Sequence, residues 1–282
     1  MEKTKYREVI SSKKSTYDLR LYELWNYRDL IWLFVKRDFI AQYKQTLLGP
    51  LWIVLQPLLM ASVFYVIFGK IASIPTENIH PFLFYFSGLA FWNYFSEGLV
   101  KTSNTFLTNA PLFGKVYFPR LAVPLSIVIS GLFKLLIHLL ILTVLLLVLG
   151  WNGIHSVSLD WTLGLIPIYI FLLAMLGLGL GVLLSALTAK YRDLTFLLSF
   201  GVQLLMYATP ILYPMSFTQG KIRLWLSFNP LTPLMENVRF SLFGVGQFDG
   251  VGLLYTTGFA LLSFLIGITV FKRVEHSFMD HV

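Results

Sequence analysis

The 282-residue sequence contains no cysteine, which excludes disulfides, thiolate metal sites and a cysteine nucleophile. Charged residues are also scarce. They make up 13% of the chain, whereas a soluble domain usually carries about 25%. Hydrophobic residues make up 56%. A chain this apolar cannot bury its side chains in one fold surrounded by water, so the bilayer must act as much of its solvent.

Motifs for nucleotide and metal binding are missing as well. Gly-Lys occurs at 69–70, 114–115 and 220–221, but no pair has the following Ser or Thr and the earlier glycine of a phosphate-binding loop. The five histidines do not show the spacing of a zinc helix. We therefore expect no catalytic site, no metal site and no cofactor in this chain. Energy for uphill transport must then come from another chain or from an ion gradient.

The pattern of apolar runs predicts an all-α, polytopic membrane protein. The first 50 residues are expected to form a cytoplasmic leader without a secretory signal, followed by an amphipathic interface helix over 24–48. A domain of six transmembrane helices follows over 51–273, and residues 274–282 form a cytoplasmic tail. The expected spans are 51–73, 82–104, 122–149, 161–188, 195–213 and 251–271. The region 215–243 is too interrupted by prolines and charges to cross, and we expect a re-entrant helix pair there.

The distribution of basic residues predicts the orientation. Ten of the 22 Lys and Arg precede Gly49. With the expected spans, at least 16 Lys and Arg lie on one side and three on the other. Because basic flanks stay in the cytoplasm, both termini should lie inside.

Two charges fall within the expected spans. Lys134 lies near the middle of the third span, with His138 one turn further on, and Glu97 lies in the inner half of the second. Because a charge in the bilayer is costly, each must face protein or water. One alternative is a structural ion pair between the two helices. The other is a channel-facing or proton-linked site.

Aromatic and small residues mark two further features. The second span contains Trp92, Tyr94 and Phe95, which lie too deep for the usual interfacial aromatic belt. They are candidates for lining a channel in which flat rings contact sugars, together with Trp52 and Tyr207. The fourth span carries Gly177, Gly181 and Ser185 at four-residue spacing, which is typical of close helix packing.

Several segments together resemble one family. They are Tyr27-Arg-Asp-Leu, Lys36-Arg-Asp, Gln42-Tyr-Lys-Gln-Thr-Leu-Leu-Gly-Pro-Leu-Trp-Ile-Val-Leu-Gln-Pro57, Lys115-Val-Tyr-Phe-Pro-Arg-Leu121, Thr209-Pro-Ile-Leu-Tyr-Pro214 and Asn229-Pro-Leu-Thr-Pro-Leu-Met-Glu236. In this order they resemble the permease subunits of type-2 ABC transporters that export surface polysaccharide. The resemblance extends from about residue 24 to residue 272. The chain departs from the family pattern at Lys134, where relatives often place an acid.

The resemblance implies a homodimer joined to two copies of a separate ATPase, which would bind ATP and Mg. The exported substrate would be a lipid-linked polysaccharide such as O-antigen, with teichoic acid as an alternative. The residues implied in ATPase coupling are Arg37, Tyr43, Lys115, Tyr117, Phe118 and Arg120. The residues implied in an outer gate are Tyr213, Pro214, Asn229, Pro230, Glu236 and Arg239.

Two other function classes remain open from the residues alone. A secondary transporter could use Lys134, Glu97 and His138 as an ion relay, and it would work without an ATPase. A membrane glycosyltransferase would need a large polar outer loop or clustered carboxylates. The expected outer loops carry only widely spaced acids, which places this class third.

Overall fold

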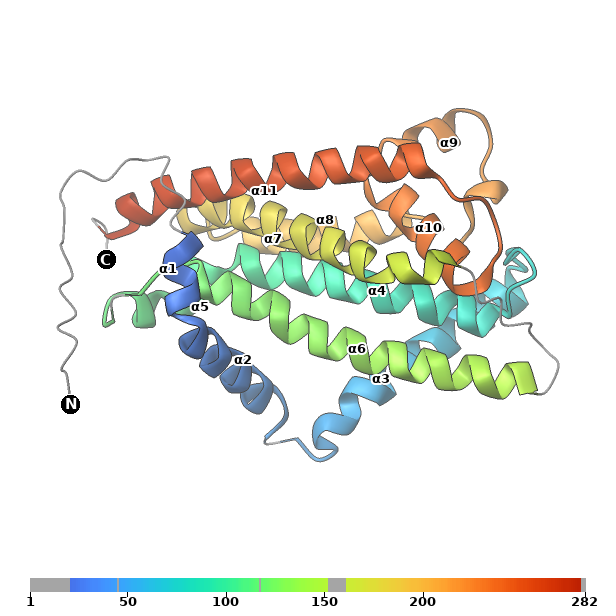
Figure 1. The fold of residues 1–282 in the computed structure, drawn as a ribbon, viewed down its shortest axis with the longest axis horizontal. Coiled ribbons are helices and arrows are strands. Elements are labelled where there is room, and N and C mark those ends of the chain that lie inside the picture. Colours follow the sequence, from blue (N-terminus) through green and yellow to red (C-terminus); the bar gives the residue numbers. More distant parts are fainter. Residues whose placement is uncertain (1–20, 45, 117, 152–160, 280–282) are drawn as a thin grey trace.

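The computed structural model describes residues 21–279 except 45, 117 and 152–160, and within this part the chain forms helices and no strand. The prediction of an all-α fold is therefore confirmed. Four long helices run along the molecule (Figure 1): α4 (Pro81–Ser103), α6 (Ala122–Trp151), α7 (Ile166–Lys190) and α11 (Gly250–Met279). Helix α7 packs between α4 and α11, and α6 packs on α4.

Four stretches are long and apolar enough to cross a membrane. They are Gly49–Ile71, Ala122–Trp151, Trp161–Lys190 and Gly250–Arg273. They coincide within a few residues with the first, third, fourth and sixth expected spans. A helix needs about 20 apolar residues to cross a hydrocarbon core of roughly 30 Å, and each of the four meets this length.

The expected second span has a different character. It corresponds to α4, which has 23 residues but is not among the four apolar stretches. Glu97, Lys101 and several Tyr, Trp and Ser residues lower its hydropathy. Sixteen of its residues are buried, because α3, α6, α7, α8 and α10 surround it. Neighbouring helices, rather than lipid, therefore provide most of its surroundings.

The expected fifth span is shorter than predicted. Helix α8 covers Leu194–Tyr207, so its length is about 21 Å at 1.5 Å per residue. Residues 208–214 continue as turns. Pro210 and Pro214 cannot donate the backbone hydrogen bonds that would extend the helix.

The N-terminal segment differs from the single helix expected over 24–48. Helix α1 (Leu21–Asn26) and helix α2 (Arg28–Tyr43) are separated at Tyr27, and a short 3₁₀ turn (Gly49–Leu51) leads into α3 (Trp52–Phe64). The turn starts at Gly49, whose positive φ of 53° suits glycine. In Figure 1, α2 and α3 form a V beside α6.

The last turns of the first span are wider than an α-helix. The chain from Tyr65 to Ile71 forms a π-helix, and the Ala72 N–H donates to the Ile67 carbonyl at 2.8 Å. Such turns are rare and usually occur singly at functional positions. Composition did not predict this one.

The connecting segments contain four short elements. The region 105–120, which follows the expected second span, begins with helix α5 (Thr105–Phe113). The two short helices predicted before the last span are present as α9 (Gly220–Ser227) and α10 (Leu231–Phe243), preceded by a 3₁₀ turn (Met215–Phe217). Figure 1 shows α1, α5 and the C-terminal turns of α11 at one end of the bundle, and α9 and α10 at the other.

The small-residue stripe of α7 packs as predicted. A Cβ atom on Gly181 would lie 2.7 Å from the Thr102 Cβ of α4, and one on Gly177 would lie 3.3 Å from the Phe95 carbonyl oxygen. On the opposite side, a Cβ on Gly179 would lie 2.7 Å from the Phe264 Cα of α11. These glycines allow three helices to approach at backbone distance.

Candidate functional site

An aromatic cluster joins the elements at the α1–α5 end of the bundle. The Phe34 and Phe118 rings lie 5.5 Å apart, and the Phe113 and Phe118 rings lie 5.7 Å apart. Two guanidinium groups cover this cluster: Arg37 lies 4.9 Å from the Phe34 ring centre, and Arg120 lies 5.3 Å from that of Phe113. The cluster connects α2, α5 and the segment 114–121 through buried contacts.

The structure brings together three of the six residues predicted for coupling. Arg37, Phe118 and Arg120 share the aromatic cluster. Lys115 is exposed, in the segment that follows α5. Tyr117 lies outside the described residues.

Tyr43, the sixth, is separate from the cluster. Its ring lies 5.1 Å from that of Phe39, near the C-terminal end of α2. Burial and, secondarily, the Glu97 carboxylate raise the pKa of the Tyr43 phenol to about 12. The phenol therefore stays neutral at physiological pH.

A second link between α2 and α5 is polar. The Arg37 Nη2 donates to the Asn109 Oδ1 at 3.5 Å, and it lies 2.8 Å from the Asp38 Oδ1. The Arg37 side chain thus contacts Asn109 of α5 and also covers the ring of Phe34 in its own helix, α2. Arg37 therefore connects α2 to α5 directly.

The two predicted intramembrane charges are in contact. The Lys134 Nζ donates to the Glu97 Oε1 at 2.6 Å and to the Gln42 Oε1 at 2.9 Å. The Lys101 Nζ lies 2.5 Å from the same Glu97 oxygen. The ion pair between α4 and α6 thus extends to α2 through Gln42. Its role as a structural pair or as part of a transport path stays a prediction.

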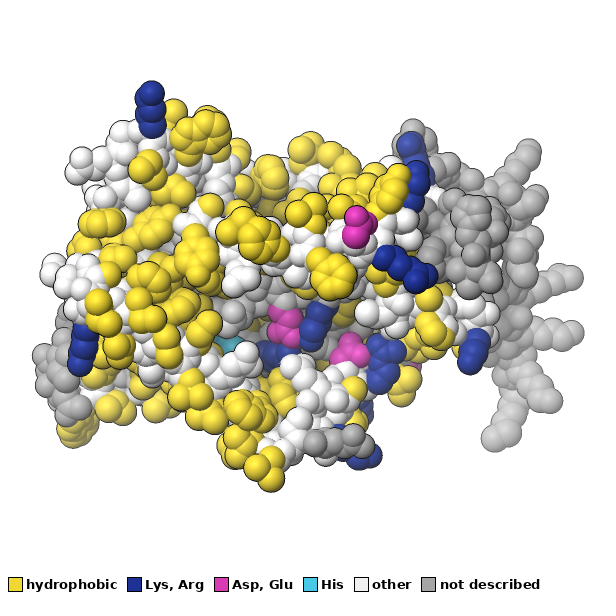
Figure 2. Space-filling view, turned by 180° about the vertical axis from the view of Figure 1, so that it is seen from behind, with side chains coloured by type: hydrophobic (Ala, Val, Ile, Leu, Met, Phe, Trp, Pro, Cys, Tyr) yellow, Lys and Arg dark blue, Asp and Glu magenta, His cyan; other side chains and the backbone are white. Residues whose placement is uncertain are grey.

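These charges line a small polar cavity between α2, α4 and α6. Asp38, Gln42, Glu97, Lys101, Ser130 and Lys134 contribute to its wall. Figure 2 shows acidic and basic side chains gathered in a hollow of this face, with hydrophobic side chains around it. We refer to it below as the polar cavity.

His138 does not join the charge cluster by a direct hydrogen bond. Its Nε2 lies 3.0 Å from the Ile53 carbonyl oxygen of α3. In an uninterrupted helix that carbonyl would accept from the N–H of residue 57, which is a proline without an N–H. His138 of α6 therefore supplies the donor that Pro57 removes. This contact points to a structural role.

The opposite end of the bundle is organised by Arg239 of α10. Its Nη2 donates to the Ile211 carbonyl at 2.9 Å, and its Nη1 donates to the Glu236 Oε1 at 3.1 Å. The guanidinium also lies 3.8 Å from the centre of the Phe84 ring of α4. Arg239 is almost fully buried, so one cation fixes α10 against both α4 and the turn after α8.

The other predicted gate residues belong to the same end of the bundle. The Asn229 Nδ2 donates to the Ala208 carbonyl and to the Thr209 hydroxyl, each at 2.9 Å. The Tyr213 hydroxyl donates to the Tyr207 carbonyl at 2.8 Å. Pro214 lies between the turn after α8 and the 3₁₀ turn, and the Pro230 carbonyl accepts from the Thr256 hydroxyl at 2.7 Å. All six predicted gate residues thus belong to one connected region.

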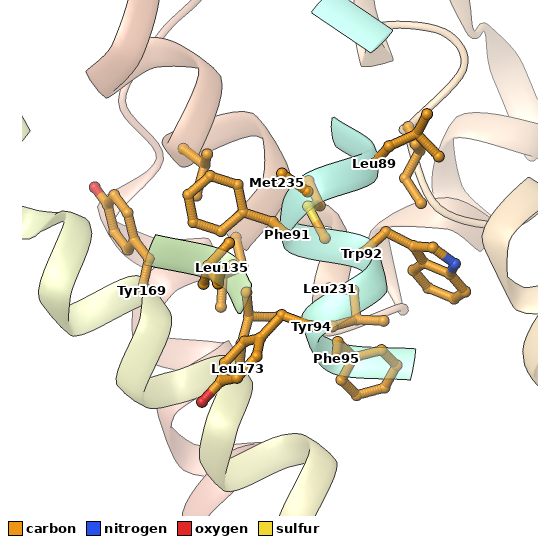
Figure 3. Close-up of a cluster of buried hydrophobic side chains, with 14 of the residues drawn as sticks. Leu89, Phe91, Trp92, Tyr94, Phe95, Leu135, Tyr169, Leu173, Leu231 and Met235 are labelled. Carbon is orange, nitrogen blue, oxygen red and sulfur yellow. The ribbon is translucent and has the colours of Figure 1, made fainter. Parts of the chain in front are cut away.

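The predicted channel-lining residues fall into two groups. Trp92, Tyr94 and Phe95 are buried in α4. Figure 3 shows Trp92 and Tyr94 leaving opposite sides of this helix. In this conformation they pack within one chain and do not reach its surface. Trp52 of α3 and Tyr207 of α8 are exposed instead, at 39% and 50%.

Sequence reasoning missed three polar residues that hold these regions together. They are Gln42, Asn109 and Asn237, whose Nδ2 donates to the Asp249 carbonyl at 2.9 Å. Asn237 also accepts from the Asp249 N–H at 2.8 Å. Of the three only Asn237 is buried, and for it the apolar surroundings are a usable signal, because a buried amide must find partners. The sequence did not show which partners these would be.

Comparison with known proteins finds one matching family model and several proteins that are similar over most of the chain. A family model described as ABC-2 type transporter matches residues 29–243. An O-antigen export system permease protein RfbA of Klebsiella pneumoniae is 30% identical over 254 residues, covering 89% of this chain and 94% of that protein. The protein of the same name from Myxococcus xanthus is 32% identical over 219 residues, covering 76% and 80%. The polysialic acid transport protein KpsM of Escherichia coli is 23% identical over 250 residues, covering 86% and 92%.

Proposed function

Because the chain belongs to the ABC-2 type transporter family, we propose that it is the membrane permease of an ATP-driven exporter of lipid-linked polysaccharide. The observation that carries this proposal is the similarity, over nearly the whole chain, to permeases named for O-antigen export. O-antigen or a related surface glycan is the proposed substrate. The chain would have no catalytic activity of its own.

We propose a topology with six spans and both termini in the cytoplasm, in a bacterial inner membrane. The four apolar stretches would be joined by α4, whose 23 residues extend about 35 Å, and by α8 with the turns that follow it. Helices α9 and α10 would form the re-entrant pair on the outer side. Residues 1–50, 51–273 and 274–282 would be the cytoplasmic leader with the interface helix, the membrane domain and the cytoplasmic tail.

The transport channel would form between two copies of the chain. Helices α3 and α8 present many exposed apolar side chains, and both also expose amides, Gln56 and Gln203. An amide that faces lipid chains lacks partners, whereas one that faces a water-filled channel is solvated. Trp52 and Tyr207 would line this channel. Trp92, Tyr94 and Phe95 would join its wall only when the neighbouring helices move away from α4.

Coupling would occur at the α1–α5 end. Two copies of a separate ATPase, which bind ATP and Mg, would contact the exposed segment around Lys115, including Tyr117. Movement of this segment would displace Phe118 and Arg120, and through Phe34 and Arg37 it would displace α2. Tyr43 at the end of α2 would transmit the movement toward α3. The outer residues from Tyr213 to Arg239 would then open the gate.

The test is association with the ATPase. Lys115 and Val116 are both exposed, so a double variant with Lys115→Glu and Val116→Asp should fold normally. A charge reversal and a buried polar group at an interface each cost several kcal/mol, or roughly 100-fold or more in affinity. We expect the variant to lose copurification with the ATPase and to stop surface display of the glycan.

The matched control is the pair Lys221→Glu and Ile222→Asp in α9, where a lysine followed by a β-branched aliphatic residue is likewise exposed, at the opposite end. This variant should copurify with the ATPase like the wild type. Normal copurification of the Lys115 and Val116 variant would contradict the coupling role of the segment.

A further inference from the structure

None of the residues that line the polar cavity is among the coupling or gate residues proposed above. We propose that it binds the phosphate group of a membrane lipid. Its wall combines residues from the interface helix α2 with residues from α4 and α6, so a ligand there would contact three separate elements. The proposal is based on charge, on an unpartnered hydroxyl and on size.

The charges around the cavity are unequal. The Lys134 and Lys101 ammonium groups both contact a single oxygen of Glu97, at 2.6 Å and 2.5 Å. The other carboxylate, Asp38, is already paired with Arg37 at 2.8 Å. The wall of the cavity therefore carries two ammonium groups that share one carboxylate oxygen, while its second carboxylate is already neutralised by Arg37 from outside the wall. A bound anion would compensate the second ammonium group, and the Lys134 side chain is only 13% exposed.

A buried hydroxyl lines the same cavity. Ser130 of α6 is 9% exposed, and its Oγ has no hydrogen-bond partner within the described residues. Most buried hydroxyls have a partner, because an unpaired one costs free energy. A phosphate oxygen in the cavity would accept from Ser130 and from the nearby ammonium groups. Phosphate is a good acceptor of such charge-assisted bonds.

The size of the cavity limits what enters. Its volume is about 20 Å³, slightly more than the roughly 10–15 Å³ that one water requires. This space admits the oxygens of a headgroup phosphate but not a sugar ring. The glycan would therefore remain outside, and only the charged group of the lipid would enter.

The hydrophobic part of such a lipid has a surface beside the cavity. Phe133, Leu136 and Leu140 of α6 lie within two turns of Lys134, and all three are exposed. The phosphate could come from a bilayer phospholipid or from the phosphate that links lipid to glycan in the proposed substrate. The second source depends on the proposed function, whereas phosphate binding itself does not.

The test measures lipid binding to the purified full chain by native mass spectrometry. The probes are phosphatidylglycerol, undecaprenyl phosphate and, as a control without phosphate, diacylglycerol with the same acyl chains as the phosphatidylglycerol. Removing one hydrogen bond to a charged group should weaken binding of the phosphate lipids about tenfold. We expect this loss in Ser130→Ala and at least this loss in Lys134→Gln.

Two further variants separate ligand binding from folding. Glu97→Gln removes a negative charge, so it should strengthen phosphate binding. Ser62→Ala changes an exposed serine of α3 and should leave binding unchanged. Tighter binding of phosphatidylglycerol would identify a bilayer lipid, and tighter binding of undecaprenyl phosphate would identify the substrate. The proposal is overturned if diacylglycerol binds equally well, or if Ser130→Ala and Lys134→Gln bind like the wild type, as expected of a cavity that holds only water. Export is not measured, so the proposed function could fail without affecting this result.

Discussion

Pro57 and His138 illustrate how single residues keep backbone polar groups hydrogen-bonded inside an apolar helix bundle. Pro57 frees the Ile53 carbonyl, and the His138 Nε2 lies 3.0 Å from it. In hydrocarbon surroundings an unpaired carbonyl costs several kcal/mol. The contact also connects α3 to α6, so the imidazole ring of His138 helps to fix the position of α3.

The first prediction concerns this pair. His138→Ala should destabilise the protein by about 1–3 kcal/mol, because the Ile53 carbonyl loses its donor. In a Pro57→Ala background the N–H of residue 57 can serve that carbonyl, so the same histidine change should cost clearly less. Unfolding titrations of the four proteins of this double-mutant cycle measure the difference. An equal cost in both backgrounds would show that His138 acts otherwise.

At the scale of elements, α4 and α7 form the centre of the bundle. Helix α7 contacts α4 with Gly177 and Gly181, and α11 with Gly179. Because these contacts involve backbone atoms, they leave little room to adjust. Neighbouring helices therefore cover most of the aromatic side chains of α4.

The second prediction tests this packing. In Gly181→Ala the added Cβ would lie 2.7 Å from the Thr102 Cβ, so the helices must separate, at a cost of typically 1–3 kcal/mol. The control is Gly258→Ala in α11, where no atom lies within 4 Å of the added Cβ. This control should be neutral or more stable by up to roughly 1 kcal/mol through helix propensity. Thermal unfolding would contradict the packing account if Gly181→Ala melted at or above the control.

The sequence predicted the positions of the long helices better than it predicted the side-chain contacts between them. Apolar runs located four crossing stretches, since length and hydropathy are local properties. The early end of α8 agrees with the local signal of Pro210 and Pro214, whereas no residue pattern marked the break at Tyr27 or the π-helix after Phe64. A contact between Lys134 and Glu97 was one of two alternatives that the sequence left open, because a charge in the bilayer must face protein or water. The sequence did not predict that Gln42, 92 residues away from Lys134 in the chain, would join this contact.

At the scale of the whole molecule, the two ends of the bundle are held together by different kinds of contact. One end gathers α1, α2 and α5 around an aromatic cluster with two arginines, and the other holds α9 and α10 around Arg239. The sequence assigned coupling residues to the first end and gate residues to the second. The structure brings five coupling residues to the α2–α5 side and all six gate residues to the other end. The proposal that the first end faces the cytoplasm is based on the distribution of basic residues alone.

The third prediction concerns this orientation. Because the chain has no cysteine, single cysteines can be labelled without background. Lys115→Cys and Lys221→Cys change exposed residues at opposite ends. A membrane-impermeant maleimide applied to spheroplasts should label the Lys221→Cys variant directly and the Lys115→Cys variant only after the membrane is permeabilised. The reverse pattern would invert the topology and with it the coupling surface.

The central claim, export driven by a separate ATPase, is tested most directly in inverted inner-membrane vesicles that contain this chain, the partner ATPase and radiolabelled lipid-linked polysaccharide. The measured quantity is polysaccharide protected inside the vesicles over time. The account predicts uptake that requires both ATP and the partner, continues in the presence of a protonophore and disappears in the Lys115→Glu, Val116→Asp variant. Uptake without the ATPase that a protonophore abolishes would contradict it and favour an ion-driven transporter.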